Sequence, residues 1–127
     1  MIDPASILDR KRVLVVEDEM LVALLIEDLL YDLGCIVIGP FGTLRKALDA
    51  AASEAFDLAV LDVNLAGERA YPVAEVLTGR NIPFVFLSGY GQSAMPRNRP
   101  EWKVCSKPFR REALATALAS RLVAHTP

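Results

Sequence analysis

Short β-branched runs alternate with helical patterns along this chain, and that alternation limits the possible folds more than any other feature. Apolar runs typical of strands occur at residues 12–16, 35–39, 58–63, 83–88 and 103–106. Between most of these runs, leucine and alanine recur at helical spacing. Parallel strands joined by helices are covered on both faces, so they read as short, nearly continuous apolar runs. The pattern therefore predicts an α/β fold with a doubly wound parallel sheet.

The expected helices carry recognisable start and stop signals. Leucines within 21–33 form a helical stripe, and Gly34 is well placed to end that helix. Thr43 can cap a second helix, and Pro72 fits the first position of a third. A last helix carries a leucine stripe at 114–122. These signals place one helix after each of the first three strands and one after the fifth.

The connection after the fourth strand is the exception. A helix is expected between 89 and 102, but Pro96 and Pro100 interrupt any long helical run there. We expect at most a turn or two of helix, with local mobility, so that the fourth helix is shortened or irregular.

Length and charge exclude several classes of function. The 127 residues suit one domain, and 53% of them are hydrophobic, enough for a substantial core. The formal net charge of −2 gives no general attraction to nucleic acid or to an anionic membrane. No apolar run approaches a membrane span or a secretion signal, so a cytoplasmic location is expected. Cys35 and Cys105 are expected to be free thiols, and the lone His125 argues against a zinc site.

Polar side chains occur where the predicted strands end. They are Glu17, Asp18, Asp62, Ser88 and Lys107. In open parallel sheets, ligand sites lie beyond the carboxyl ends of the strands. Carboxylates that converge there without a counter-charge raise one another's pKa, so positive charge is needed. Lys107 supplies one cation, and Mg²⁺ is the expected second because carboxylates, a backbone carbonyl and water are suitable ligands for it.

Four motifs in this order and spacing carry a resemblance to a known family. They are "VLVVEDE", "LAVLDVNL", "FLSG" and "CSKPF". Together they resemble the receiver domain of bacterial two-component response regulators, the CheY-like family. The resemblance implies a flavodoxin-like (βα)5 fold with five parallel strands in the order 2-1-3-4-5. It covers residues 12–122, so we expect a single receiver domain over 1–127 with short polar tails at both ends.

The resemblance also implies a phosphoacceptor site that depends on Mg²⁺. Asp62 would be the phosphoacceptor, attacking the phosphorus of a phosphohistidine to form an acyl phosphate. Asp18 would bind Mg²⁺ directly and Glu17 would help through water. Asn64 would offer its backbone carbonyl to the metal. Such a domain is not a classical enzyme, because it catalyses only its own phosphorylation and dephosphorylation.

Two further positions complete the implied site. Ser88 would hydrogen-bond a phosphoryl oxygen, and Lys107 would pair with the phosphoryl group or with Asp62. The Lys107–Pro108 bond is expected to be cis, as in the family. The implied partners are a sensor histidine kinase or phosphotransfer protein and a downstream protein, with no nucleic acid and no membrane.

The chain also departs from the common family pattern. Val104 stands where most receivers carry the aromatic switch residue, and Ala66 replaces a common proline. The stretch "PFVFLSGY", 83–90, resembles an atypical subgroup of receivers often found as stand-alone regulators. That subgroup tends to pair with histidine kinases of the HWE or related class. We expect the loop 89–102 to replace the usual switch, with Tyr90 as a candidate for the missing aromatic group.

Three functions remain in competition at this stage. The first is a signalling switch that accepts phosphate and acts through protein contacts, since no effector domain is present. The second is a phosphatase of the haloacid-dehalogenase type, but Asn64 stands where that pattern needs a general acid. The third is an unphosphorylated adaptor, which the loss of the aromatic group at Val104 suggests. Nucleotide binding has no support, because the chain lacks a Gly-rich phosphate loop.

Overall fold

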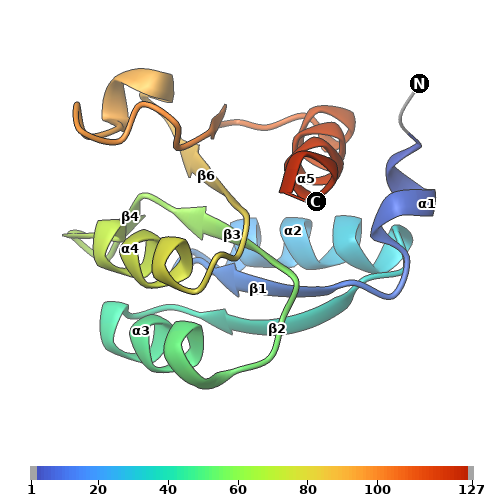
Figure 1. The fold of residues 1–127 in the computed structure, drawn as a ribbon, viewed down its shortest axis with the longest axis horizontal. Helices are drawn as coiled ribbons and strands as arrows, with labels where there is room; N and C mark the ends of the chain where they lie inside the picture. The colour runs from blue at the N-terminus through green and yellow to red at the C-terminus, as the bar shows by residue number, and fades with distance from the viewer. Residues whose placement is uncertain (1–2, 126–127) are drawn as a thin grey trace.

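The computed structural model describes residues 3–125 and contains a five-stranded parallel sheet (Figure 1). Its strands are β1 (Arg12–Val16), β2 (Ile36–Phe41), β3 (Leu58–Asp62), β6 (Phe84–Ser88) and β7 (Val104–Ser106). They lie in the order β2-β1-β3-β6-β7, which confirms the fold predicted from the sequence. Because β1, β3 and β6 are interior strands covered by helices, nearly all of their residues are buried.

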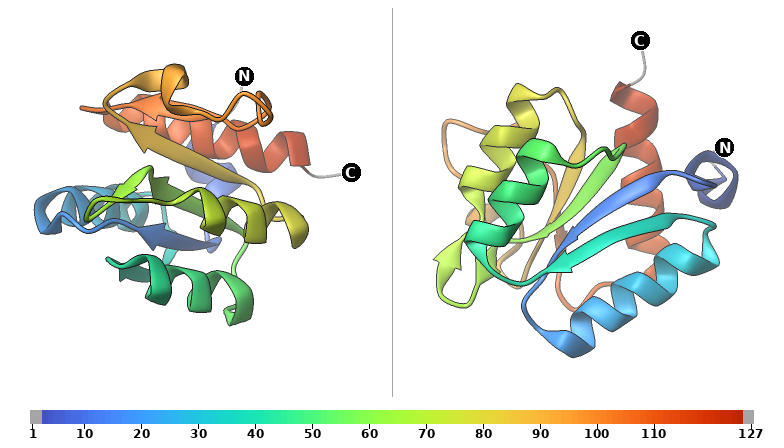
Figure 2. Two further views of the ribbon diagram at one scale, coloured as in Figure 1. Left: turned by 90° about the vertical axis from the view of Figure 1, so that its left-hand side faces the viewer. Right: turned by 90° about the horizontal axis from the view of Figure 1, so that it is seen from below.

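Helices cover both faces of this sheet (Figure 2). The sheet therefore separates two hydrophobic cores, one on each face. One layer contains α3 (Leu44–Ser53) and α4 (Tyr71–Gly79). The other contains α2 (Met20–Asp32) and α5 (Arg111–His125). Alternate residues of β1 face opposite layers: Leu14 and Val16 belong to the first core, and Val13 and Val15 belong to the second. None of the helices in the described part of the chain is long and apolar enough to cross a membrane.

The N-terminal residues are not simply a polar tail. A short helix, α1 (Pro4–Leu8), precedes β1 and packs against α5. Leu8 is fully buried in the core between the sheet, α2 and α5. Its carbonyl oxygen accepts a hydrogen bond from the Cys35 thiol at 3.4 Å. Described residues before Arg12 therefore contribute to the core, which the sequence pattern did not indicate.

Helix α2 exposes part of its leucine stripe. Ile26 and Leu30 are fully buried against the sheet, as the spacing predicts. Leu21 and Leu25 nevertheless remain 76% and 56% exposed, because the helix has more apolar residues than one buried face can hold. Gly34 follows the helix with φ of 80°, a conformation that favours glycine.

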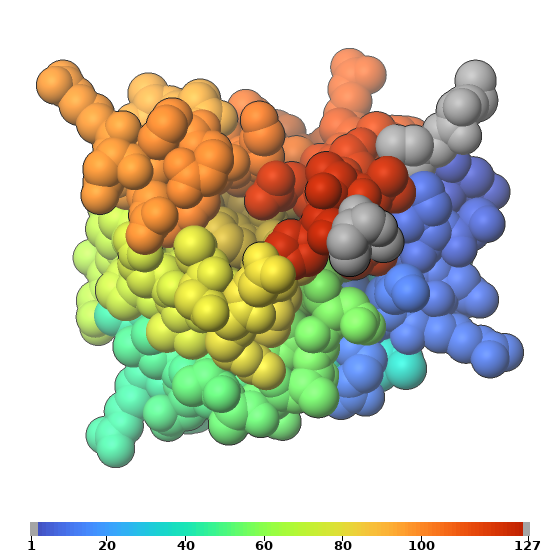
Figure 3. Space-filling model, in the orientation of Figure 1, coloured from blue at the N-terminus to red at the C-terminus, as the bar shows by residue number. Residues whose placement is uncertain are grey.

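Residues 89–103, named the strap here, replace the helix expected after β6. The strap contains only one turn of 3₁₀ helix, η1 (Gly91–Ala94), which agrees with the prediction of a shortened fourth helix. Trp102, only 2% exposed, packs with Phe84 and Phe86 of β6 and with Tyr71 of α4. The strap, coloured orange, forms a lobe beside α4 (Figure 3).

Candidate phosphoacceptor site

The carboxyl ends of the four strands β1, β3, β6 and β7 meet at one edge of the sheet. Asp62 is the last residue of β3, Ser88 is the last of β6, and Glu17 follows β1 directly. All three are buried, although each carries a polar side chain. A pocket of about 220 Å³ opens at this edge. It is lined by Asp18, Glu19, Asp62, Val63, Asn64, Ala66, Arg69, Ser88, Gly89, Tyr90 and Lys107.

Lys107 joins the two buried carboxylates. Its Nζ lies 3.0 Å from Asp62 Oδ2 and 3.3 Å from Glu17 Oε1. Its backbone N–H donates to the Ser88 carbonyl oxygen at 2.9 Å, which holds the residue beside β6. Desolvation by burial lowers the pKa of Lys107, but contacts with Asp62 and Glu17 outweigh it, and the net shift is upward. The lysine therefore stays charged at neutral pH. The Lys107–Pro108 peptide bond is cis.

The negative charge of Glu17 is destabilised by its surroundings. Desolvation by burial, followed by the close approach of Asp62, raises the pKa of Glu17 to about 7. One of its oxygens, Oε2, accepts a hydrogen bond from the Glu19 backbone N–H at 3.1 Å. The other, Oε1, is buried and has only the Lys107 ammonium, 3.3 Å away, beside it, without a well-formed hydrogen bond. Lys107 is shared between Glu17 and Asp62, so one ammonium group serves two buried carboxylates and the charged form of Glu17 remains costly.

A small hairpin holds Asp18 in place. The strands β4 (Asn64–Leu65) and β5 (Glu68–Arg69) pair antiparallel across the turn at Ala66 and Gly67. The Ala66 N–H donates to Asp18 Oδ2 at 3.0 Å, and Ala66 has φ of 50°. Proline could provide neither that donor nor that angle, which explains why the common proline is replaced here.

The same hairpin is anchored to the phosphoacceptor candidate. The backbone N–H of Asn64 donates to Asp62 Oδ1 at 3.2 Å. The Asn64 side-chain oxygen accepts from the Gly67 N–H at 3.1 Å, so that side chain is used to brace the turn. Asp62 is thus held by a backbone donor on one oxygen and by Lys107 on the other.

The acidic residues at this edge fit a hard divalent cation. Glu17, Asp18 and Asp62 each offer a carboxylate oxygen, and these oxygens all lie within 4.8 Å of one another. Carboxylate oxygens at this spacing are the ligands that Mg²⁺ prefers.

The two candidate switch residues occupy different places, because Tyr90 follows β6 and Val104 begins β7. The Ser88 hydroxyl oxygen accepts a hydrogen bond from the Tyr90 N–H at 3.0 Å, while the Tyr90 ring is 80% exposed. Val104 is half-buried and packs against the first core beside Phe86. Tyr90 therefore lines the pocket without occupying the core position where an aromatic group is missing.

The sequence of this chain matches a known protein family. The model of the response regulator receiver domain matches residues 13–119. The chain belongs to the response regulator receiver family. A search of curated proteins finds no match to this receiver.

Several solved structures resemble this receiver over nearly its whole length. The solution structure of SdrG from Sphingomonas melonis Fr1 is 37% identical, covers 90% of this chain and 97% of that chain, and has a TM-score of 0.76. The BeF3-activated conformation of SdrG, from Pseudomonas melonis Fr1, is 38% identical, with coverage of 90% and 98% and a TM-score of 0.74. The receiver domain of PhyR from Erythrobacter litoralis is 28% identical, with coverage of 94% and 95% and a TM-score of 0.79.

Two charged pocket residues were not predicted from the sequence. Arg69 and Glu19 both line the pocket, although neither stands at the end of a sheet strand. Glu19 lies beside the predicted pair Glu17 and Asp18, so its proximity could have been inferred. Arg69 reaches the site only because the receiver forms the β4–β5 hairpin, and two-residue strands leave no periodicity in a sequence.

Proposed function

We propose that this receiver accepts a phosphoryl group on Asp62 in a reaction that requires Mg²⁺ and then signals through protein contacts. The donor is a sensor histidine kinase, of the HWE or a related class, or a phosphotransfer protein. The observation that carries the proposal is the buried Asp62 carboxylate, 3.0 Å from Lys107 Nζ and clustered with Glu17 and Asp18. Phosphoryl transfer needs this kind of positioning and charge neutralisation more than covalent help.

Each residue of the proposed site has a separate task. An Asp62 oxygen attacks phosphorus, forming an oxygen–phosphorus bond as the phosphorus–nitrogen bond of the donor phosphohistidine breaks. Lys107 offsets charge on Asp62 and on the transferred group. The Ser88 hydroxyl accepts from Tyr90 N–H and keeps its own proton available for a phosphoryl oxygen.

The acidic cluster would hold the metal ion. Asp18 and Asp62 would bind Mg²⁺ through carboxylate oxygens, Asn64 through its backbone carbonyl, and Glu17 through water. When bound, Mg²⁺ supplies positive charge that neutralises the carboxylates and the phosphoryl oxygens. The raised pKa of Glu17, about 7, is the expected mark of a carboxylate that lacks this neutralisation.

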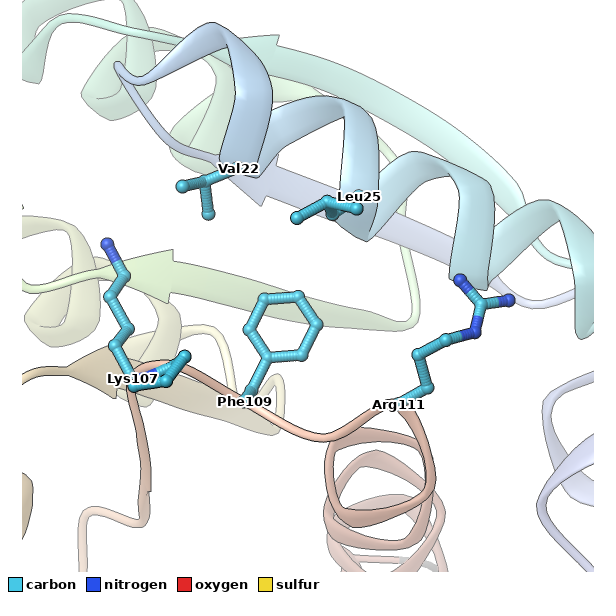
Figure 4. Close-up of a pocket in the computed structure, with 6 residues that line it drawn as sticks. Val22, Leu25, Lys107, Phe109 and Arg111 are labelled. Atoms are coloured by element: carbon cyan, nitrogen blue, oxygen red, sulfur yellow. The ribbon is translucent and has the colours of Figure 1, made fainter.

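An apolar groove beside Lys107 supports a protein as the phosphodonor. The groove has a volume of about 370 Å³, and Lys107 lines both the groove and the acidic pocket. Figure 4 shows Val22 and Leu25 projecting from α2 toward Phe109 on the connection from β7 to α5. A kinase must bring its phosphohistidine to Asp62 and therefore contacts the surface near this site. An amphipathic helix of the kinase is expected to bind in the apolar groove.

Acyl phosphate formation tests the proposal directly. Purified protein is incubated with acetyl phosphate and Mg²⁺, and the mass gain of one phosphoryl group is followed by intact-protein mass spectrometry. We expect wild type to be labelled, and labelling to be lost when EDTA removes the metal. Asp62→Asn should abolish labelling, because the amide is not a nucleophile for phosphorus. The exposed Asp57→Asn is the matched control and should be labelled like wild type.

Equal labelling of Asp62→Asn and wild type would refute the assignment of the phosphoacceptor. A wild-type protein that forms no acyl phosphate with Mg²⁺ would favour the adaptor function instead. Turnover of small phosphomonoesters would favour a phosphatase.

A further inference from the structure

Arg69 is a cation in the acidic pocket that forms no ion pair with any residue in the described part of the chain. The pocket is lined by carboxylates and by two cations, Lys107 and Arg69. Lys107 is already engaged by Asp62 at 3.0 Å and by Glu17 at 3.3 Å. Within residues 3–125, no carboxylate forms a salt bridge with Arg69. Arg69 is therefore the one pocket cation in the described chain whose charge is free to meet an anionic ligand.

The register of the hairpin places Arg69 on the face that carries Asn64. In the β4–β5 pair, Arg69 is directly opposite Asn64, so the two side chains share one face. Both residues line the pocket. Glu68 is opposite Leu65 and its side chain projects from the other face, so it does not neutralise its neighbour.

Hydrogen bonds make this hairpin a firm support. The Ala66 N–H is bonded to Asp18 at 3.0 Å, and the Asn64 N–H is bonded to Asp62 at 3.2 Å. Arg69 is thus carried on an element that is anchored to the candidate phosphoacceptor itself. An arginine whose backbone is anchored in this way loses less backbone entropy when it binds an anion than one on a free loop.

The charges around the pocket opening affect how an anionic phosphodonor approaches Asp62. A phosphodonor that approaches Asp62 must pass the exposed carboxylate of Glu19, which repels it, and that of Asp18 repels it too wherever no metal ion is bound. A free guanidinium at the same opening attracts an anion and can bind two of its oxygens at once. The attraction grows with the charge of the donor.

We propose that Arg69 determines phosphodonor specificity by binding the incoming donor and favouring donors with two negative charges. This rests on the proposed role of Asp62. With acetyl phosphate, an Asp62 oxygen bonds to phosphorus, the bond from phosphorus to the acetyl oxygen breaks, and acetate leaves with the electron pair. With phosphoramidate, which has a net single negative charge, the phosphorus–nitrogen bond breaks and ammonia leaves with its three protons. No further proton or reactant is needed in either reaction.

Labelling rates with these two donors test the proposal. Second-order rate constants are measured with Mg²⁺ at low donor concentration for wild type, Arg69→Gln and Arg69→Lys. We expect Arg69→Gln to lower the rate constant for acetyl phosphate about fivefold and that for phosphoramidate less than about twofold. Arg69→Lys should restore most of the loss, and added salt should shrink the difference between donors. Arg97→Gln removes another exposed arginine, which lies outside the pocket, and should change neither rate.

Equal rates for Arg69→Gln and wild type with acetyl phosphate would overturn the specificity role while leaving Asp62 as phosphoacceptor. Equal losses with both donors would overturn it as well, because a merely structural defect affects every donor. Failure of wild type to be labelled by either donor would overturn the phosphoacceptor role and this inference together. The urea midpoint of each variant, compared with wild type, identifies any loss that comes from unfolding.

Discussion

Glu17 keeps only 3% of its surface exposed, and burial raises its pKa to about 7 from an ordinary value of 4.5. The folded protein therefore binds a proton at Glu17 more tightly than the unfolded chain does. A group with a raised pKa contributes stability that is fully present below pH 4.5 and is lost as pH rises through about 7. Without metal, the acidic pocket thus destabilises the fold at neutral pH.

Replacing Glu17 should relieve that cost. In EDTA, wild type is expected to lose stability between about pH 5 and pH 8, on the order of 1–3 kcal/mol, whereas Glu17→Gln stays level. The variant should then be the more stable protein at about pH 8, as measured by urea unfolding. The exposed Glu54→Gln serves as the control and should follow wild type. A wild-type stability that rises across this range would contradict the prediction.

The strap is the element that most distinguishes this receiver. It is anchored at its far end by Trp102, and the Arg99 guanidinium lies 5.3 Å from the centre of the Trp102 ring and pairs with Glu75 of α4. At its near end, the Tyr90 N–H bonds the Ser88 hydroxyl. Any movement of Ser88 toward a phosphoryl oxygen would therefore break or shift the first contact of the strap.

Amide hydrogen exchange is expected to report this coupling. We predict that beryllofluoride with Mg²⁺ slows exchange within 89–102 by at least about tenfold, because the strap becomes ordered around Ser88. The measurement is exchange mass spectrometry with and without beryllofluoride. Asp62→Asn should show no such change, since the anion needs the Asp62 carboxylate. Unchanged exchange throughout the strap of wild type would exclude its role as the switch.

Elements differ in how far the sequence alone predicts them. Sheet strands such as 58–62 are buried on both faces, so their continuous apolar residues make them easy to recognise. The helix α1 has five residues and one buried side chain, Leu8, which is too little for a periodic pattern. The β4–β5 hairpin depends on bonds from its backbone to Asp18, and no local pattern records such a contact.

At the scale of the molecule, the parallel sheet is what assembles the site. Strands β1, β3, β6 and β7 run in one direction, so their carboxyl ends meet although Glu17 and Lys107 are 90 residues apart in sequence (107 − 17). This rule made most of the candidate site predictable from polar residues at strand ends. The rule did not predict Arg69, because the position of this residue depends on a hairpin outside the five-stranded sheet.

The same arrangement places an apolar surface beside the phosphoacceptor. The first half of α2 exposes Met20, Leu21, Leu24 and Leu25, each more than half exposed. Leu25 also lines the groove that Lys107 shares with the acidic pocket. Large exposed apolar surfaces are typical of protein contacts. Because Lys107 lines both this groove and the acidic pocket, we propose the groove as the docking site of the phosphoryl donor.

Leu25→Asp separates reaction with a kinase from reaction with a small molecule. A carboxylate in the groove would have to be desolvated on docking, so we expect phosphotransfer from a histidine kinase to slow at least about tenfold. Labelling by acetyl phosphate should persist, since this small donor needs no groove. Tyr31→Asp changes an exposed residue of the same helix outside the groove and is the matched control. The kinase used in this experiment is chosen from a panel of phosphorylated histidine kinases as the one that transfers phosphate to wild type fastest. Transfer to Leu25→Asp at the wild-type rate would exclude the groove as the docking site, whereas a loss shared by both donors would indicate damage to the fold.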